Sequence, residues 1–347
     1  MRKLYVYILL LMPLLAVNAQ DANFLLLRHH YTINSDGSVD YNVRKELKLL
    51  RNRSFAQYGE TYVVYNPAFE SVKINEAYTI RKDGTRVEVP QNAFISQLPT
   101  ACQNCGRLNG IRELVVVHTA LEYDATIVLD YTIHRATTVL DQELCVQQPD
   151  PVNMFDFIID APSNSLYEVS VSKPIQGCGA SIQTVSDGHA YHIQARDVQP
   201  LDNDFYGGKN CRDVVVISNP KASVAAEPIA ALSECASVLA ELKSDSQSEY
   251  ASAIARYVQS NIVTNHIRQS LLQYRYASPS EVWSSGCATD AEKSLLLVAM
   301  LKQAGFQAQV VDVDKGVVSA VVDGDSIVLY AIQNPSSSAS DSVSVSR

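Results

Sequence analysis

The chain has 347 residues, of which 47% are hydrophobic, and its 37 acidic and 28 basic side chains leave a net charge of −9. A chain of this length can fold into two domains with a sizeable core each, without a metal to hold it together. The acidic excess is mild and no long run of either sign occurs, which argues against nucleic-acid binding, because that function needs clustered lysine and arginine.

Residues 1–19 have the pattern of a secretory signal peptide. A basic start, Met1-Arg-Lys, precedes an apolar run from Leu4 to Val17, and small residues end at Ala19. The apolar run is shorter than the roughly 20 residues that span a bilayer, so a membrane anchor is the weaker interpretation. The sequence therefore predicts export to the periplasm or beyond, a mature chain from about Gln20, and no transmembrane segment in that chain.

Residues 20–222 alternate apolar and polar side chains, which is typical of half-buried strands. Turn dipeptides at Asp36-Gly37, Asp83-Gly84 and Asp187-Gly188 lie between such segments and predict hairpins, since they suit the positive φ angles of tight turns. Leu114 to Val117 and Thr126 to Ile133 are rich in β-branched residues and predict further strands. The pattern predicts an antiparallel β-sandwich-like domain.

The chain has an odd number of cysteines, so in an oxidising compartment at least one thiol is free or paired between chains. The seven are Cys102, Cys105, Cys145, Cys178, Cys211, Cys235 and Cys287. The only close pair, Cys102 and Cys105, lies in a glycine-rich loop, and no second pair or histidine cluster accompanies it. We expect a small disulfide loop or two reduced structural thiols there, and no metal or cofactor.

The period changes after residue 222. Ile229 to Leu242 and Tyr250 to Ile262 predict amphipathic helices, followed by a loop that contains Pro279. The motif Thr289-Asp-Ala-Glu292 matches a capping box, which sets Thr289 as the N-cap of a helix that is apolar almost all round. Gly305 is a suitable C-terminal stop for this helix.

Strands are predicted beyond that helix, at Gln309 to Val313, at Val317 to Val322 and at Ile327 to Ile332. Residues 333–347 are serine-rich without periodicity and are expected to form a disordered tail. The predicted organisation is thus a signal peptide, a β-rich domain over 20–222, an α+β core over 223–332 and the tail.

The segment Glu281 to Val311, with Gly-Cys-Ala-Thr-Asp-Ala-Glu-Lys-Ser-Leu-Leu-Leu and a later Ala-Gly-Phe-Gln-Ala, resembles the core of bacterial transglutaminase-like domains. The region before it, with Tyr65-Asn-Pro67, Phe69, Ala77 and Asp83-Gly84, is similar to the β-rich domain of unknown function that precedes such cores in exported bacterial proteins. Together the two resemblances cover most of the mature chain. They imply an α+β protein in which a β-rich domain precedes a core with a cysteine-proteinase-like fold.

Catalytic members of that family carry a cysteine at the head of this helix, then a histidine and an aspartate on the following strands. An ungapped alignment backwards from Ala304-Gly-Phe306 places Asp290 in the nucleophile slot, and Cys287 lies three residues earlier. No histidine occurs from Cys287 to Arg347. A thiol without a nearby base keeps a pKa of about 8.5 and is mostly protonated at neutral pH.

His266 is the remaining candidate for a base, although it precedes Cys287 and the family order does not place the base there. The other histidines lie in the strand-rich half and are interpreted as ordinary sheet residues: His29, His30, His118, His134, His189 and His192. Trp283, the single tryptophan, is expected to pack against the central helix rather than to line a ligand site.

The sequence therefore predicts an exported, degenerate transglutaminase-like protein without catalysis, which acts as a binding or structural module for a protein, peptide or glycan of the cell envelope. The alternative is an active cysteine-dependent protease, amidase or transglutaminase that uses Cys287, with His266 or a partner chain as the source of the base. A third reading is a shortened relative of longer proteins without an independent role.

Overall fold

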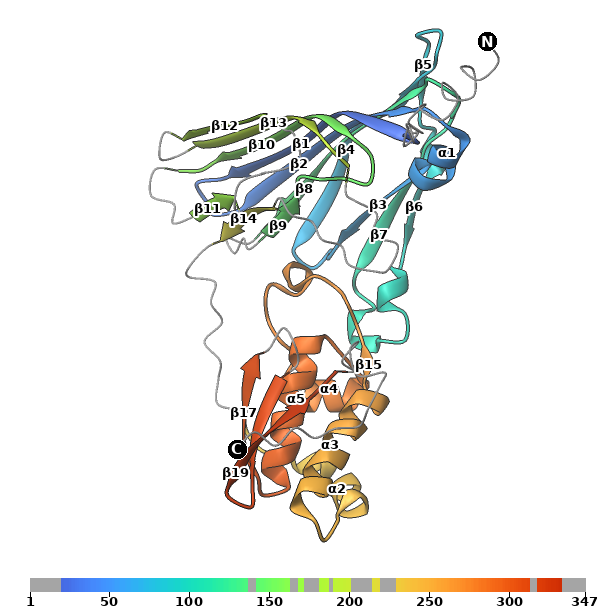
Figure 1. The fold of residues 1–347 in the computed structure, drawn as a ribbon. Coiled ribbons are helices and arrows are strands. Elements are labelled where there is room, and N and C mark those ends of the chain that lie inside the picture. The colour runs from blue at the N-terminus through green and yellow to red at the C-terminus, as the bar shows by residue number, and fades with distance from the viewer. Residues whose placement is uncertain are drawn as a thin grey trace, which may run out of the picture.

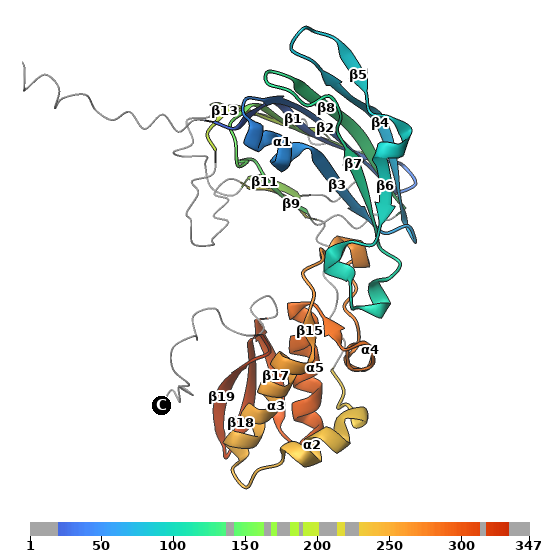
Figure 2. The same ribbon diagram turned by 90° about the vertical axis from the view of Figure 1, so that its right-hand side faces the viewer.

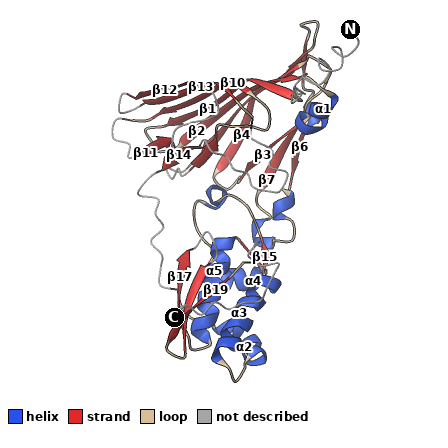
Figure 3. Ribbon diagram, viewed as in Figure 1, coloured by secondary structure: helices blue, strands red, loops and turns tan. Residues whose placement is uncertain are grey.

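The computed structural model describes residues 20–136, 142–162, 168–171, 181–186, 190–200, 214–218, 229–312 and 317–332. Strands dominate the N-terminal part, and helices α2 to α5 gather in the C-terminal part (Figures 1 and 3). The predicted signal peptide, the boundary near residue 222 and the serine-rich tail lie outside the described residues. The predicted α+β class is confirmed.

The N-terminal part is built on an eight-stranded sheet with the order β12-β13-β10-β1-β2-β8-β4-β5. Its strands are β1 (Ala22–Ile33), β2 (Val39–Leu49), β4 (Glu70–Ile80), β5 (Arg86–Glu88), β8 (Thr126–Arg135), β10 (Val152–Asp160), β12 (Ser181–Ser186) and β13 (Ala190–Val198). The hairpins β1–β2, β4–β5 and β12–β13 are the three predicted from the turn dipeptides. Gly37 and Gly84 have φ angles of 87° and 84°, as those turns require.

One pairing in this sheet differs from the prediction of an antiparallel domain. β1 pairs with β10 in parallel, with Leu27 opposite Phe155 and Tyr31 opposite Ile159. Both strands bury alternate large side chains on the same face, and Tyr31, Phe155 and Phe157 are fully buried there. Local periodicity cannot distinguish the two directions, because it fixes which face is buried and not the direction of the neighbouring strand.

Two three-stranded sheets complete the strand-rich part. One has the order β3-β7-β6 and the other β11-β14-β9. Their strands are β3 (Glu60–Tyr65), β6 (Phe94–Gln97), β7 (Arg112–Val117), β9 (Gln142–Cys145), β11 (Glu168–Val171) and β14 (Val214–Ser218), and the short helix α1 spans Asn52–Tyr58. Figures 1 and 2 show both sheets on the same side of the large sheet, so the strand-rich part is layered.

Three polar side chains, Lys45, Thr61 and His118, form a hydrogen-bonded cluster between two of these layers. The Lys45 ammonium on β2 donates to Oγ1 of Thr61 over 2.7 Å, and Nε2 of His118 lies 3.0 Å from the same hydroxyl. Burial, with a smaller contribution from the Lys45 charge, lowers the pKa of His118 to about 3. His118 is therefore neutral in the folded protein, and it is a buried structural residue and not one of the sheet's exposed positions.

This burial makes stability depend on pH. A histidine in the unfolded chain has a pKa of about 6.5. Between this pH and the folded-state pKa of about 3, the unfolded state binds a proton at His118 and the folded state does not. The free energy of unfolding therefore decreases as the pH falls from about 6.5 towards 3. We expect the free energy of unfolding to fall by on the order of 2 kcal/mol more in the natural protein than in His118→Gln between about pH 6.5 and 4.5. Urea unfolding at the two pH values measures this difference, and parallel losses in both proteins would contradict it.

The described residues of the C-terminal part form four α-helices and short strands. The helices are α2 (Ala236–Leu242), α3 (Gln247–Asn261), α4 (Pro279–Ser285) and α5 (Asp290–Gln303), and the strands are β15 (Val263–Thr264), β16 (Cys287–Ala288), β17 (Gln307–Asp312), β18 (Val317–Val322) and β19 (Asp325–Tyr330). β15 pairs with β16 in parallel, and β17, β18 and β19 form an antiparallel sheet. α5 is buried along almost its whole length, from Ala291 to Leu301, as predicted for a central helix.

Two helical predictions need correction. The segment with Pro279, predicted to be a loop, is helix α4, because Ser278 caps it, Pro279 occupies its first turn and Glu281 completes a capping box. The helix predicted from Ile229 begins only at Ala236, after a 3-10 turn at Ser233–Cys235. The amide of Leu232 instead donates to the Ala299 carbonyl of α5, which fixes this segment against the central helix.

No helix in the described part of the chain is long and apolar enough to cross a membrane.

Candidate functional site

The start of α5 is fixed by its capping box. The Thr289 side chain accepts a hydrogen bond from the Glu292 amide over 3.3 Å, and the Glu292 carboxylate accepts one from the Thr289 amide over 2.8 Å. Asp290 is therefore the first helical residue, in the register that the sequence predicts. Its carboxylate lies at the positive end of the helix dipole, where a negative charge is stabilised.

Cys287 lies just before this helix start. Gly286 ends α4 with a φ of 66°, and the chain then enters β16, which pairs with β15. The Cys287 side chain is fully buried, and its sulfur forms a disulfide with Cys105, 182 residues away along the chain. The sulfur is thus oxidised in this structure and carries no thiol.

The disulfide corrects the pairing expected near residue 105. Cys102 and Cys105 do not form a small local loop with each other: Cys102 is a free, buried cysteine. The connection between β6 and β7 contains the 3-10 turns Thr100–Cys102 and Gly106–Leu108, and it carries Cys105 to the head of α5. Connections of this range leave no local pattern in a sequence, so the partner of Cys287 could not be predicted.

His266 lies beside Asp290. Its Nδ1 is 3.9 Å from the Asp290 carboxylate, and its side chain is 77% exposed. An exposed ion pair at this distance holds an imidazole only weakly in place. The two candidate residues are thus neighbours, but the pair consists of a carboxylate and an imidazole without a thiol.

Glu292 anchors the β6–β7 connection to the helix. Its carboxylate is fully buried and accepts hydrogen bonds from the amides of Thr289 and Ala277, each over 2.8 Å, and from the Arg107 guanidinium. Sequence reasoning identified Glu292 only as a capping residue and missed Arg107 entirely. No pattern around Arg107 marks it, because its partner is 185 residues away.

Three more polar contacts cover the head of the helix. The Gln269 amide group donates to the Thr289 hydroxyl over 3.3 Å, and the Asn265 backbone amide donates to the Ala288 carbonyl over 2.7 Å. The Asn265 side chain also donates to the Ala101 carbonyl of the β6–β7 connection. Lys293, one turn into the helix, is buried, and this burial lowers its pKa while the Asp290 charge opposes the shift.

In the described part of the chain, the residues at the start of α5 do not combine a free thiol with a neighbouring base. A cysteine nucleophile must be a thiolate, activated by an adjacent base that a third group orients. Here the sulfur before α5 is bonded to a second sulfur, the first helical residue, Asp290, carries a carboxylate, and the neighbouring imidazole of His266 is exposed. The same residues connect the two parts of the chain through the Cys105–Cys287 disulfide and the Arg107–Glu292 ion pair.

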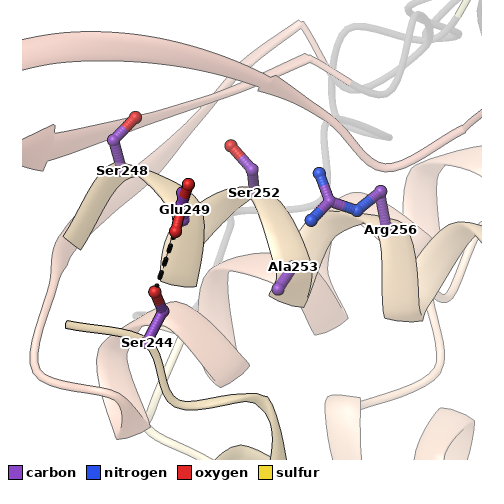
Figure 4. Close-up of a pocket in the computed structure, with 6 residues that line it drawn as sticks. All are labelled: Ser244, Ser248, Glu249, Ser252, Ala253 and Arg256. Carbon is purple, nitrogen blue, oxygen red and sulfur yellow. Dashed lines mark hydrogen bonds between the residues drawn. The ribbon is translucent and has the colours of Figure 1, made fainter. Parts of the chain in front are cut away.

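The described residues contain no group of three or more histidine, cysteine, aspartate or glutamate side chains that could hold a metal ion. A pocket of about 370 Å³ lies on α3, and Figure 4 shows the side chains around it. It is lined by Ser244, Ser248, Glu249, Ser252, Ala253 and Arg256. None of the predicted site residues lines this pocket.

The remaining sequence candidates have structural roles. Trp283 packs against the core cluster that contains α5, and its ring stacks on Tyr257 at a centroid distance of 5.9 Å. Three sheet histidines pair with carboxylates: His30 with Asp160, His134 with Asp40 and His192 with Asp156. His29 accepts or donates a hydrogen bond of 2.7 Å with Tyr41, and His189 lies outside the described residues.

Comparison with known families agrees with this division of the chain. Residues 35–202 match a domain of unknown function, DUF3857, and residues 236–319 match the transglutaminase-like superfamily. The chain joins a DUF3857 domain to a transglutaminase-like core. The second match spans α2 to β18 and includes His266, Cys287 and Asp290, so the candidate residues lie within the transglutaminase-like core.

A solved structure from Parabacteroides distasonis ATCC 8503, described as a "putative protease", is similar over both parts. It shares 27% sequence identity with this chain at a TM-score of 0.75, and the likeness covers 90% of this chain and 67% of that one. No curated protein matches the chain by sequence. The fold of the transglutaminase-like core is therefore shared with a structure that bears a protease description.

Proposed function

We propose that this protein is an exported, non-catalytic transglutaminase-like protein that acts as a binding or structural module in the cell envelope. The observation that carries the proposal is the disulfide between Cys287 and Cys105, which engages the sulfur that directly precedes α5 in the chain. Asp290 in the nucleophile position and the exposed imidazole of His266 support the same conclusion.

Export is supported by the disulfides. Besides Cys105 and Cys287, Cys145 is also disulfide-bonded, and such bonds persist in oxidising compartments such as the periplasm. The signal-like pattern of residues 1–19 agrees with that location. The binding partner in this proposal is a protein, peptide or glycan of the envelope.

One observation favours a second function. The Parabacteroides distasonis structure that is similar to this chain is described as a "putative protease". It favours the alternative of an active cysteine-dependent protease, amidase or transglutaminase. In that alternative the disulfide would first be reduced, and the Cys287 thiolate would attack an amide with His266 as base. This alternative predicts a measurable reaction that requires Cys287.

A turnover measurement separates the two functions. The mature protein, oxidised or reduced with dithiothreitol, is incubated with casein, with a glutamine peptide and a fluorescent amine, and with simple amides. We expect the rates of hydrolysis, ammonia release and amine incorporation to equal those of Cys287→Ser in both redox states, because neither state supplies a thiolate with an oriented base. A rate that exceeds the variant's and disappears on the Cys287→Ser substitution would establish the alternative.

A further inference from the structure

Three cysteines gather where the two parts of the chain meet. Cys102, Cys105 and Cys287 belong to one buried cluster, together with Leu108, Ile111 and Leu271. Two of them form the disulfide, and the third is a free thiol. The cluster thus contains a free thiol, on Cys102, and a disulfide, Cys105–Cys287, with which that thiol could exchange.

The backbone brings Cys102 close to Cys105. Gln103 has φ −61° and ψ 143°, Asn104 has φ 65°, and the Cys105 amide donates to the Cys102 carbonyl over 3.3 Å. These values define a type II β-turn, in which the first and fourth Cα atoms lie within about 7 Å. Disulfides span Cα distances of about 4.4–6.8 Å, so the turn brings the two Cα atoms near the range in which Cys102 and Cys105 can bond once their side chains face each other.

We propose that this cluster is a thiol–disulfide exchange site, in which Cys102 displaces Cys287 from Cys105 and so releases the disulfide link between the DUF3857 domain and the transglutaminase-like core. The Cys102 thiol gives its proton to a solvent base, and the thiolate attacks Sγ of Cys105. The bond between Cys105 and Cys287 breaks, and its electron pair leaves with the Cys287 sulfur, which takes up a proton. One disulfide and one thiol are present before and after the step, so no oxidant or reductant is consumed.

The folded protein restrains the exchange. Burial, together with the nearby charge of Glu113, raises the pKa of the Cys102 thiol, which keeps it protonated at neutral pH. Exchange therefore accelerates as the pH rises or when the β6–β7 connection opens. After exchange the two parts remain joined by the polypeptide chain and by non-covalent contacts, among them the Arg107–Glu292 ion pair and the hydrogen bond of 2.8 Å from Asn66 to the Leu271 carbonyl.

The exchange differs from catalysis in what it requires and in how it is detected. It needs Cys102 and no substrate, whereas the enzymatic alternative needs Cys287, a base and an amide. Loss of the exchange in a Cys102 variant leaves the turnover experiment unaffected, so failure of one proposal is distinguishable from failure of the other.

Peptide mapping tests the exchange. The mature protein is incubated at about pH 8.5 with iodoacetamide for up to about a day; its remaining thiols are then blocked with N-ethylmaleimide in denaturant, and it is digested with trypsin near neutral pH. The resting form yields peptide 87–107 linked to peptide 276–293, and the exchanged form yields peptide 87–107 with an internal disulfide and peptide 276–293 alkylated at Cys287. We expect Cys287 alkylation to be at least about tenfold slower in Cys102→Ser, because that variant lacks the attacking thiol.

Cys235 is an internal control for unfolding. It is buried, unpaired and lies in the core of the C-terminal part, so it becomes alkylated only when that core opens. The proposal requires Cys287 to react while Cys235 stays protected. It is overturned if Cys287 remains unmodified in the natural protein, if it reacts equally fast in Cys102→Ser, or if fragmentation of the linked peptides shows that Cys102 is bonded to Cys287.

Discussion

Cys287→Ser is expected to lower the free energy of unfolding by about 2–5 kcal/mol, which would be among the largest effects of any single substitution in this chain. The disulfide closes a loop of 182 residues, and for such a length the chain-entropy account gives about 5 kcal/mol. The substitution also places a hydroxyl in a fully buried position. We expect the core, which contains Cys287, to unfold at a lower urea concentration than in the natural protein.

Trp283 makes the measurement specific, because the single tryptophan lies in the C-terminal part and reports the unfolding of the core. Cys235→Ser is the matched control: it makes the same substitution at a fully buried but unpaired cysteine, and we expect a loss of about 1 kcal/mol. Equal losses in the two variants would mean that the covalent link between the two parts contributes nothing to stability.

Glu292→Ala is expected to destabilise the protein by about 3–5 kcal/mol. The Glu292 carboxylate has no exposed surface, and its loss removes the acceptor for two backbone amides and leaves the Arg107 guanidinium largely buried without its partner. Removing one partner of a buried ion pair is more harmful than removing both, because the remaining charge stays desolvated. Thermal and urea unfolding measure the change.

α4 offers the control, since it begins with a capping box of the same type. There Glu281 is about half exposed and its cationic partner, Arg275, lies at the surface. Glu281→Ala is therefore expected to cost about 1 kcal/mol. In a double-mutant cycle, Arg107→Ala should be less harmful in the Glu292→Ala background than alone. Equal losses for Glu292→Ala and Glu281→Ala, or additive effects in the cycle, would contradict the role assigned to the buried pair.

Much of the fold follows from local sequence patterns. Asp36-Gly37 and Asp83-Gly84 predict hairpins that the structure contains, because few residues other than glycine adopt the backbone angles of these turns. Thr289 and Glu292 predict the first residue of α5, because a capping box satisfies specific amides at a helix start. The burial of α5 follows equally from its apolar residues.

Other features depend on residues far apart in the chain and could not be predicted. The parallel pairing of β1 with β10 joins segments about 130 residues apart, and the same alternation would suit an antiparallel partner. α4 was missed for a different reason. Its seven residues are too short for a periodic signal, although Ser278, Pro279 and Glu281 together form a helix start that could have been recognised.

The features of the candidate site also fall into those that follow from local sequence and those that depend on residues far apart in the chain. The register that places Asp290 at the first helical position follows from sequence, and the structure places His266 next to it. The bond from Cys287 to Cys105 and the ion pair from Glu292 to Arg107 join positions more than 180 residues apart. A cysteine pattern restricts the possible partners but does not select one of them.

The reactivity of Cys287 in the reduced protein tests most directly the claim that nothing in this core activates a sulfur nucleophile. The rate of its alkylation by iodoacetamide at about pH 6 is compared with that of a model thiol such as glutathione, and peptide 276–293 identifies the modified residue. We expect a rate equal to or below that of the model thiol, since Cys287 is buried and the neighbouring carboxylate of Asp290 does not stabilise a thiolate. A rate at least about tenfold above the model thiol, lost on His266→Ala, would show an activated cysteine and contradict the account.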